Sequence, residues 1–81
     1  MKMRESKRFK EVNVYEYGDF LIEITVSNKD YEAWIRHEDY GIAQLMFGQE
    51  RKDVTYAVFK AMVYENLDEY IELYREEYMN D

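Results

Sequence analysis

The stretch FLIEITVSNKDYEAWIRH, residues 20–37, decides the fold class. Apolar and polar side chains alternate along residues 20–26 and again along residues 31–37, which is the period of a strand with one buried face. The residues SNKD between the two runs are typical of a turn. The predicted register pairs Val26 with Tyr31, Ile24 with Ala33 and Ile22 with Ile35. The stretch therefore predicts an antiparallel hairpin.

A preceding strand is predicted at residues 11–17, EVNVYEY, joined to the hairpin across Gly18 and Asp19. The turn length decides which side chains of this strand face the core. A two-residue turn would set Val14 opposite Glu23. We expect the common three-residue loop instead, because it places the valines on the apolar face. The predicted core face comprises Val12, Val14, Phe20, Ile22, Ile24, Val26, Tyr31, Ala33 and Ile35.

The opposite face of the predicted sheet is not plainly polar. It carries Asn13, Tyr15, Tyr17, Leu21, Glu23, Thr25, Glu32, Trp34 and Arg36. A sheet face left in water is normally polar, and Trp and Tyr are enriched at interface hot spots. The sequence therefore predicts a patch of Tyr15, Tyr17, Leu21 and Trp34 that is covered by the last helix, by a second copy of the chain or by another protein. Stacking of single-stranded bases is a further alternative, which the acidic net charge disfavours.

Helical periodicity begins after Asp53, which we expect to be an N-cap, and no Gly or Pro follows. We predict two helices, at residues 54–64 and 67–79. The expected core face of the first helix comprises Val54, Ala57, Val58, Ala61 and Met62, and a second apolar face comprises Tyr56, Phe59 and Val63. A straight helix would run the first of these faces into acidic residues. A break at Glu65–Asn66, with Asn66 as a cap, avoids this conflict, and a single bent helix is the alternative.

The last helix is predicted to carry a stripe of acidic side chains opposite its apolar one. The stripe comprises Glu65, Asp68, Glu69, Glu72 and Glu76. Carboxylates that recur about every 5.4 Å along a helix resemble the spacing of phosphates in a nucleic-acid strand. The stripe is either the wet side of an amphipathic helix or the face of an acidic inhibitor that mimics nucleic acid.

The segment EDYGIAQLMFGQERKD, residues 38–53, admits two interpretations. Ile42, Leu45 and Met46 have the spacing of a helical turn, and a short strand fits nearly as well. Gly41 and Gly48 bracket the segment as turn points.

Length and charge limit the possible classes of protein. The chain of 81 residues is expected to form one domain at residues 9–81, preceded by a flexible basic arm at residues 1–8. It contains no cysteine, and its net charge of −7 argues against a general nucleic-acid binder. No apolar run follows the basic start or reaches the length of a membrane span, so we expect a cytoplasmic protein without a membrane partner.

The sequence shows no assembled catalytic motif. The only histidine, His37, precedes Glu38 and Asp39, but neighbours on a strand point to opposite faces, and the zinc-protease spacing is absent. We expect His37 at the core-facing end of its strand next to Phe20, as part of a polar corner. The sequence contains neither a nucleophile elbow nor a phosphate-binding glycine loop. It therefore predicts a protein that is not an enzyme and that holds no cofactor and no metal.

Two segments, AWIRHEDYGIAQLMFG at residues 33–48 and NLDEYIELYREEY at residues 66–78, resemble parts of small uncharacterised proteins of Gram-positive bacteria. The resemblance implies a bacterial origin and carries no functional residue with it.

The sequence thus predicts an α+β domain in which a three-stranded antiparallel meander is followed by two helices. The predicted function is a small acidic interaction module that binds a protein, including a second copy of itself, through the Trp and Tyr patch. The alternative is an acidic inhibitor or nucleic-acid mimic that acts through the last helix.

Overall fold

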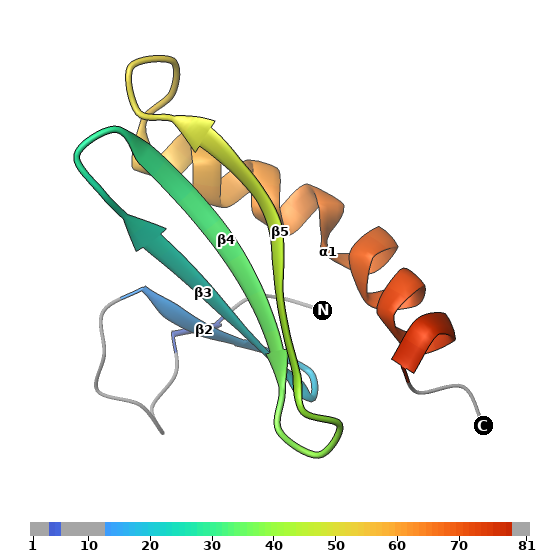
Figure 1. The fold of residues 1–81 in the computed structure, drawn as a ribbon. Helices are drawn as coiled ribbons and strands as arrows, with labels where there is room; N and C mark the ends of the chain where they lie inside the picture. Colours follow the sequence, from blue (N-terminus) through green and yellow to red (C-terminus); the bar gives the residue numbers. More distant parts are fainter. Residues whose placement is uncertain (1–3, 6–12, 79–81) are drawn as a thin grey trace.

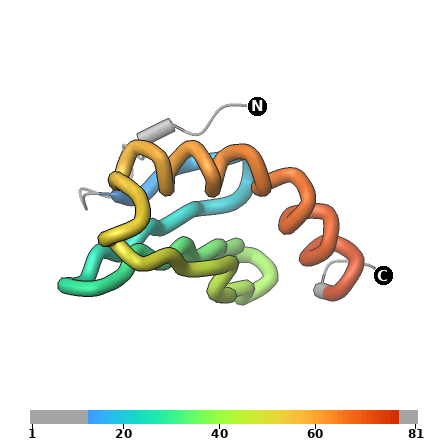
Figure 2. Tube along the Cα trace, turned by 90° about the horizontal axis from the view of Figure 1, so that it is seen from above, coloured from blue at the N-terminus to red at the C-terminus, as the bar shows by residue number. Residues whose placement is uncertain are grey.

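The structure is a computed structural model that describes residues 4–5 and 13–78, with the side chains of residues 13–77. Its elements, drawn in Figure 1, are β1 (Arg4–Glu5), β2 (Val14–Tyr17), β3 (Phe20–Val26), β4 (Asp30–His37), β5 (Ile42–Glu50) and α1 (Tyr56–Tyr78). The strands form one antiparallel sheet in the order β1-β2-β3-β4-β5. Figure 2 shows α1 running along one side of this sheet. The α+β class is confirmed, but the predicted three strands and two helices are wrong, because β1 and β5 add two strands and one helix replaces two.

Only a small part of the predicted basic arm at residues 1–8 is described. The backbone of Arg4 and Glu5 forms β1, opposite Glu16 and Tyr15 of β2. The other residues of the predicted arm, and Val12 of the predicted core face, lie outside the described residues. The division of the chain at residue 8 stays a prediction.

The hairpin of β3 and β4 has the predicted register, which pairs Val26 with Tyr31, Ile24 with Ala33 and Ile22 with Ile35. Ser27 closes the turn: its N–H donates to the Asp30 carbonyl at 2.9 Å, and its Oγ accepts from the Asp30 N–H at 3.0 Å. The inward side chains at the middle of the hairpin are fully buried. Alternation of apolar and polar residues was sufficient to place them.

The turn between β2 and β3 contains two residues, Gly18 and Asp19, and not the expected three. Tyr17 lies directly opposite Phe20, and Gly18 has a φ of 61°. Glycine with positive φ at the first central position is the arrangement of a type II′ turn, whose twist matches that of paired strands. The difference of one residue reverses both faces of β2.

Several predicted side-chain positions are wrong as a result. Tyr15 and Tyr17, predicted on the face opposite the core, are each 4% exposed and belong to the core. Val14, predicted on the core face, lies on the opposite face, where it pairs with Glu23, but it is buried there as expected, with 7% of its surface exposed. Val26 was also predicted in the core, but it is 45% exposed at the end of β3.

The segment after β4 forms the nine-residue strand β5 and not a helical turn. Its register with β4 shifts beside Trp34, which pairs with Leu45, so Met46 becomes the extra residue of a β-bulge. The bulge brings two successive side chains into the core: Met46 is buried, and the Phe47 ring lies 5.4 Å from that of Phe59. Ile42 and Met46 face the core and Leu45 lies on the outer face, so the helical spacing of these residues comes from apolar side chains on both faces of the strand.

The predicted break at Glu65–Asn66 is wrong, because α1 is one helix of 23 residues. The Asn66 side chain donates a hydrogen bond of 2.8 Å to the Met62 carbonyl within the helix and caps nothing. The predicted N-cap is also wrong. Thr55, not Asp53, precedes the first turn, and its Oγ1 accepts a hydrogen bond of 3.2 Å from the Val58 N–H.

The buried face of α1 explains why no break occurs. It consists of Phe59, Val63, Leu67, Ile71 and Tyr74. These residues are three or four positions apart and form one continuous stripe along the helix. The sequence offered two apolar faces in the first half of α1, and the predicted one is wrong, since Val58 is 48% exposed whereas Val63 is fully buried.

Candidate functional site

Tyr15 lies under the start of α1, where its hydroxyl belongs to a chain of hydrogen bonds. Tyr56 donates its hydroxyl proton to Asn13 Oδ1 at 2.7 Å, and the hydroxyl oxygens of Tyr15 and Tyr56 are 2.7 Å apart. Because a phenol carries one proton, Tyr15 is the donor to Tyr56. Lys60 Nζ lies 4.5 Å from the centroid of the Tyr15 ring, within range of a cation–π interaction. These contacts hold Tyr15 inside the chain and away from the predicted binding surface.

Tyr17 joins the sheet to the second half of α1. Its hydroxyl donates a hydrogen bond of 2.7 Å to Asp68 Oδ1. This hydrogen bond, followed by burial and by the charge of Asp68, raises the pKa of Tyr17 from 10.0 to about 12. Because of this contact, Tyr17 does not belong to the predicted aromatic patch. Asp68, predicted in the acidic stripe, binds a residue of the sheet as well as facing solvent.

The face of the sheet opposite α1 retains Trp34 and Leu21 from the predicted patch and adds Leu45. Pairing across four strands aligns Val14, Glu23, Trp34 and Leu45 in one row. Leu21 lies diagonally from Trp34 on the same face, two pairs further along the β3–β4 hairpin. Leu45 is 44% exposed, and Leu21 and Trp34 are partly exposed. We call Leu21, Trp34 and Leu45 the outer-face patch.

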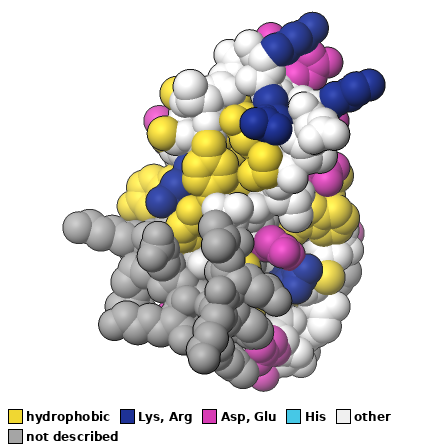
Figure 3. All heavy atoms as spheres, turned by 90° about the vertical axis from the view of Figure 1, so that its left-hand side faces the viewer, with side chains coloured by type: hydrophobic (Ala, Val, Ile, Leu, Met, Phe, Trp, Pro, Cys, Tyr) yellow, Lys and Arg dark blue, Asp and Glu magenta, His cyan; other side chains and the backbone are white. Residues whose placement is uncertain are grey.

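Charged side chains border the outer-face patch. Arg36 Nη2 lies 2.5 Å from Glu23 Oε1, and Glu23 is the direct cross-strand neighbour of Trp34. An exposed ion pair of this kind contributes about 0–1 kcal/mol to stability, so its main effect is to order the polar border. Figure 3 shows hydrophobic side chains gathered among charged ones on the side of the molecule that lies left in Figure 1. An apolar centre with a polar border is the usual composition of a protein interface.

Sequence reasoning missed Leu45 because the strand β5 was only one of two interpretations of its segment. On a strand that pairs with β4, Leu45 falls opposite Trp34 and shares its face. On a strand, Ile42, Gln44 and Met46 share one face and Ala43 and Leu45 share the other, so apolar and polar residues do not alternate here. The strand interpretation itself was the signal that could have identified Leu45, because it puts Leu45 on the outer face.

The acidic stripe lies along an uninterrupted helix. Its members Glu65, Glu69, Glu72 and Glu76 are exposed, whereas Asp68 is engaged by Tyr17. Near the C-terminal end of α1, the Arg75 guanidinium lies 5.5 Å from the centroid of the Phe20 ring and places one cation beside the stripe. Whether the stripe binds a partner stays a prediction.

The corner around His37 is buried and aromatic on its inner side. His37 is 4% exposed, and its ring meets those of Phe20 and Tyr40 edge-on, with centroid distances of 4.9 and 5.0 Å. This confirms the predicted place of His37 at the core-facing end of its strand. Nδ1 is buried, and it has no hydrogen-bond partner among the residues that the structure describes.

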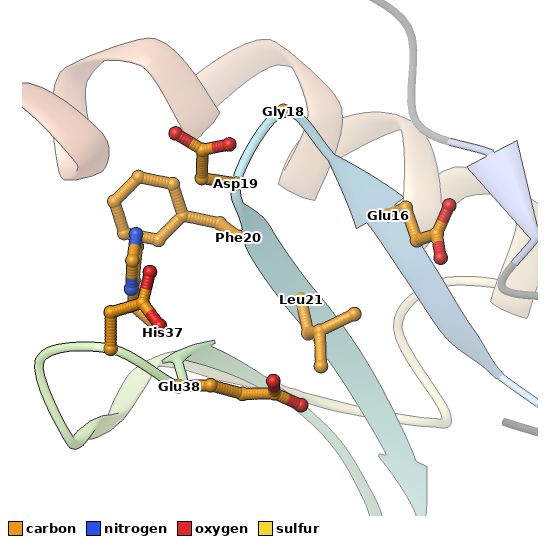
Figure 4. Close-up of a pocket in the computed structure, with 8 residues that line it drawn as sticks. Glu16, Gly18, Asp19, Phe20, Leu21, His37 and Glu38 are labelled. Carbon is orange, nitrogen blue, oxygen red and sulfur yellow. The ribbon is translucent and has the colours of Figure 1, made fainter. Parts of the chain in front are cut away.

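A shallow hollow adjoins this corner, and Figure 4 shows it between the β2–β3 turn and the end of β4. Its volume is about 300 Å³, and its lining includes His37, Glu38, Asp39 and Asp19. Within the described part of the chain, no three His, Asp or Glu side chains are close enough to hold a metal ion. Because the His37 Nδ1 atom has almost no accessible surface, a ligand in the hollow does not reach it.

Comparison of the chain with protein-family models, curated proteins and solved structures found no match. The resemblance to small proteins of Gram-positive bacteria stays a prediction. In the described part of the chain, no helix combines the length and the apolar character of a membrane span.

Proposed function

We propose that the chain is a small, non-enzymatic interaction module that binds a protein partner through the outer-face patch of Leu21, Trp34 and Leu45. One observation carries the proposal. Cross-strand pairing places Trp34 beside Leu45 on the face of the sheet that α1 does not cover. A half-buried tryptophan next to an exposed leucine supplies the apolar centre that an interface needs, and tryptophan is the residue most enriched among interface hot spots.

The electrostatics of the chain limit the class of partner. A net charge of −7 repels nucleic-acid phosphates at long range, which favours a protein over DNA or RNA. The Glu23–Arg36 pair adds both signs of charge at the border of the patch and so favours a partner with a mixed polar border. The partner is either another protein or a second copy of the chain, since homodimers are the commonest oligomers.

The test uses the immobilised protein to capture partners from cells, with identification by mass spectrometry. The variant is Trp34→Thr, which removes the indole and puts in its place a β-branched residue that is favoured in strands. The control is Val58→Ala, which changes an exposed apolar residue on α1, away from the patch. We expect a partner that the wild-type chain and Val58→Ala retain and that Trp34→Thr loses at least tenfold. Equal capture by Trp34→Thr, with its fold intact by circular dichroism, would refute the proposal.

A second candidate function is an acidic inhibitor or nucleic-acid mimic that acts through α1. The observation that favours it is the continuity of the helix, which aligns Glu65, Glu69, Glu72 and Glu76 along an exposed side. The triple variant Glu69→Gln, Glu72→Gln and Glu76→Gln keeps the shape and removes the charge. It would release a partner held by mimicry and leave one held by the outer-face patch bound.

A further inference from the structure

The edge of the sheet at β5 differs from the edge at β1. In the described part of the chain, β5 pairs with β4 on one side and with no strand on the other. The backbone N–H and C=O groups on that second side therefore make no hydrogen bonds to a neighbouring strand. This edge is nine residues long, and at the other end of the sheet the described part of β1 comprises two residues. A long edge strand is a template on which another strand can pair.

The composition of β5 does not protect it. Natural edge strands are usually kept from pairing by charged residues, by proline or by shortness. Residues 42–49, IAQLMFGQ, contain no charged residue and no proline, and the first charge is Glu50 at the end of the strand. The bulge at Met46 is the only protective irregularity within the strand. In a chain with 36% charged residues, this uncharged edge is exceptional.

We propose that two copies of the chain associate through their β5 edges, pairing antiparallel about a two-fold axis beside Leu45 to form one sheet that continues across the dimer. This inference rests on the proposed function, because it names a second copy as the partner and extends the outer-face patch across the interface. An antiparallel edge pair is isologous, so each copy contributes the same residues.

The side chains on the outer face suit this two-fold arrangement. Directly opposed residues on antiparallel strands have Cβ atoms about 4.5–5.5 Å apart. An axis beside Leu45 therefore places it against Leu45 of the second copy, with Trp34 of each copy next in the row. The row across the dimer then reads Trp34, Leu45, Leu45, Trp34, which buries apolar surface at the centre.

The absence of charged residues along β5 favours a second copy of the chain over a charged peptide as the partner of this edge. Each copy carries a net charge of −7, so two copies repel one another and can join only where acidic side chains are absent. Residues 42–49 provide such a place. A basic or acidic peptide would find no opposite charge along this strand to select it.

The first test measures the mass of the full chain by analytical ultracentrifugation from micromolar to millimolar concentration, together with amide hydrogen exchange at both ends of that range. We expect a concentration-dependent dimer at moderate salt, and alternate β5 amides whose exchange slows at least tenfold as the dimer forms. A dimer that leaves β5 exchange unchanged, or a chain that stays monomeric throughout, would overturn the inference.

Two variants localise the contact. Leu45→Lys adds a charge to the edge and should shift the dimerisation midpoint at least tenfold, whereas Val58→Lys changes a residue of similar exposure on α1 and should leave it unchanged. Because the chain lacks cysteine, Leu45→Cys introduces a single thiol. Mild oxidation should link two copies of Leu45→Cys but not two copies of Val58→Cys.

The outcomes also separate this inference from the proposed function. A dimer that loses affinity with Trp34→Thr but not with Leu45→Lys overturns edge pairing and supports association through the face of the sheet. A monomer whose outer-face patch captures a different protein overturns the second copy as partner and leaves the proposed function standing. Loss of fold in Leu45→Lys is detected by circular dichroism, and the exchange experiment on the wild-type chain then decides.

Discussion

The same substitution at two valines of α1 distinguishes the observed face of the helix from the predicted one. Val63 is fully buried and Val58 is 48% exposed. Val63→Ala removes two carbon atoms, which at about 0.8 kcal/mol each amounts to about 1.6 kcal/mol. The cavity adds about 1 kcal/mol, and the higher helix propensity of alanine offsets about 0.5 kcal/mol. We therefore expect the free energy of unfolding to fall by about 2 kcal/mol for Val63→Ala.

At Val58 the loss of partly exposed surface and the gain in helix propensity nearly cancel, so Val58→Ala should stay within about 0.5 kcal/mol of the wild-type chain. Urea unfolding followed by far-ultraviolet circular dichroism measures both values. For a domain of this size, the expected fall in Tm for Val63→Ala is about 10 °C. A larger loss at Val58 than at Val63 would refute the observed helix face and restore the predicted one.

Three further predictions concern the contacts that position the elements. Tyr17→Phe should cost about 1–2 kcal/mol at neutral pH, because a hydrogen bond to a charged acceptor is lost. Since the pKa of Tyr17 rises from 10.0 to about 12 on folding, its contribution is complete below pH 10 and disappears as the pH rises towards 12. Urea titrations across that window should show this loss in the wild-type chain and not in Tyr17→Phe. Thr55→Ala should destabilise by about 1 kcal/mol through loss of the N-cap, whereas Asp53→Ala should have little effect; equal losses in thermal unfolding would contradict the observed start of α1. Gly18→Val should destabilise by about 1–2 kcal/mol in urea unfolding, because its φ of 61° is strained for a β-branched residue, and a neutral result would argue against the two-residue turn.

Local alternation was enough to predict the β3–β4 hairpin, because one register alone puts the alternating apolar side chains of both strands on the same face. It was not enough for β2, since a valine face and a tyrosine face were both plausible. The decision depends on long-range contacts: the Tyr17 hydroxyl finds Asp68, and the Tyr15 hydroxyl finds Tyr56. Both acceptors lie on α1, far along the chain, where no local pattern could indicate them.

The predictions for the helix and for β5 were wrong for related reasons. The first half of α1 has two apolar faces, and only packing against the sheet selects the one that runs on into Leu67. In β5, apolar residues lie on both faces of the strand, with Ile42 and Met46 inward and Leu45 outward, and this arrangement imitates helical spacing. The sequence therefore predicted two residues of the candidate site and missed the third. Trp34 and Leu21 follow from the alternation of the hairpin, whereas Leu45 requires the pairing of β5 with β4.

Fluorescence offers the most direct view of the outer face, because Trp34 is the only tryptophan of the chain. Acrylamide quenching of its emission should be measured on the wild-type chain alone and with a protein partner that it captures from cells. We predict that the indole of the isolated chain is quenched readily and that quenching weakens several-fold when the partner covers the outer-face patch. An indole that is already protected from acrylamide in the isolated chain, or that stays equally quenched with the partner bound, would contradict an outer-face patch that binds a protein.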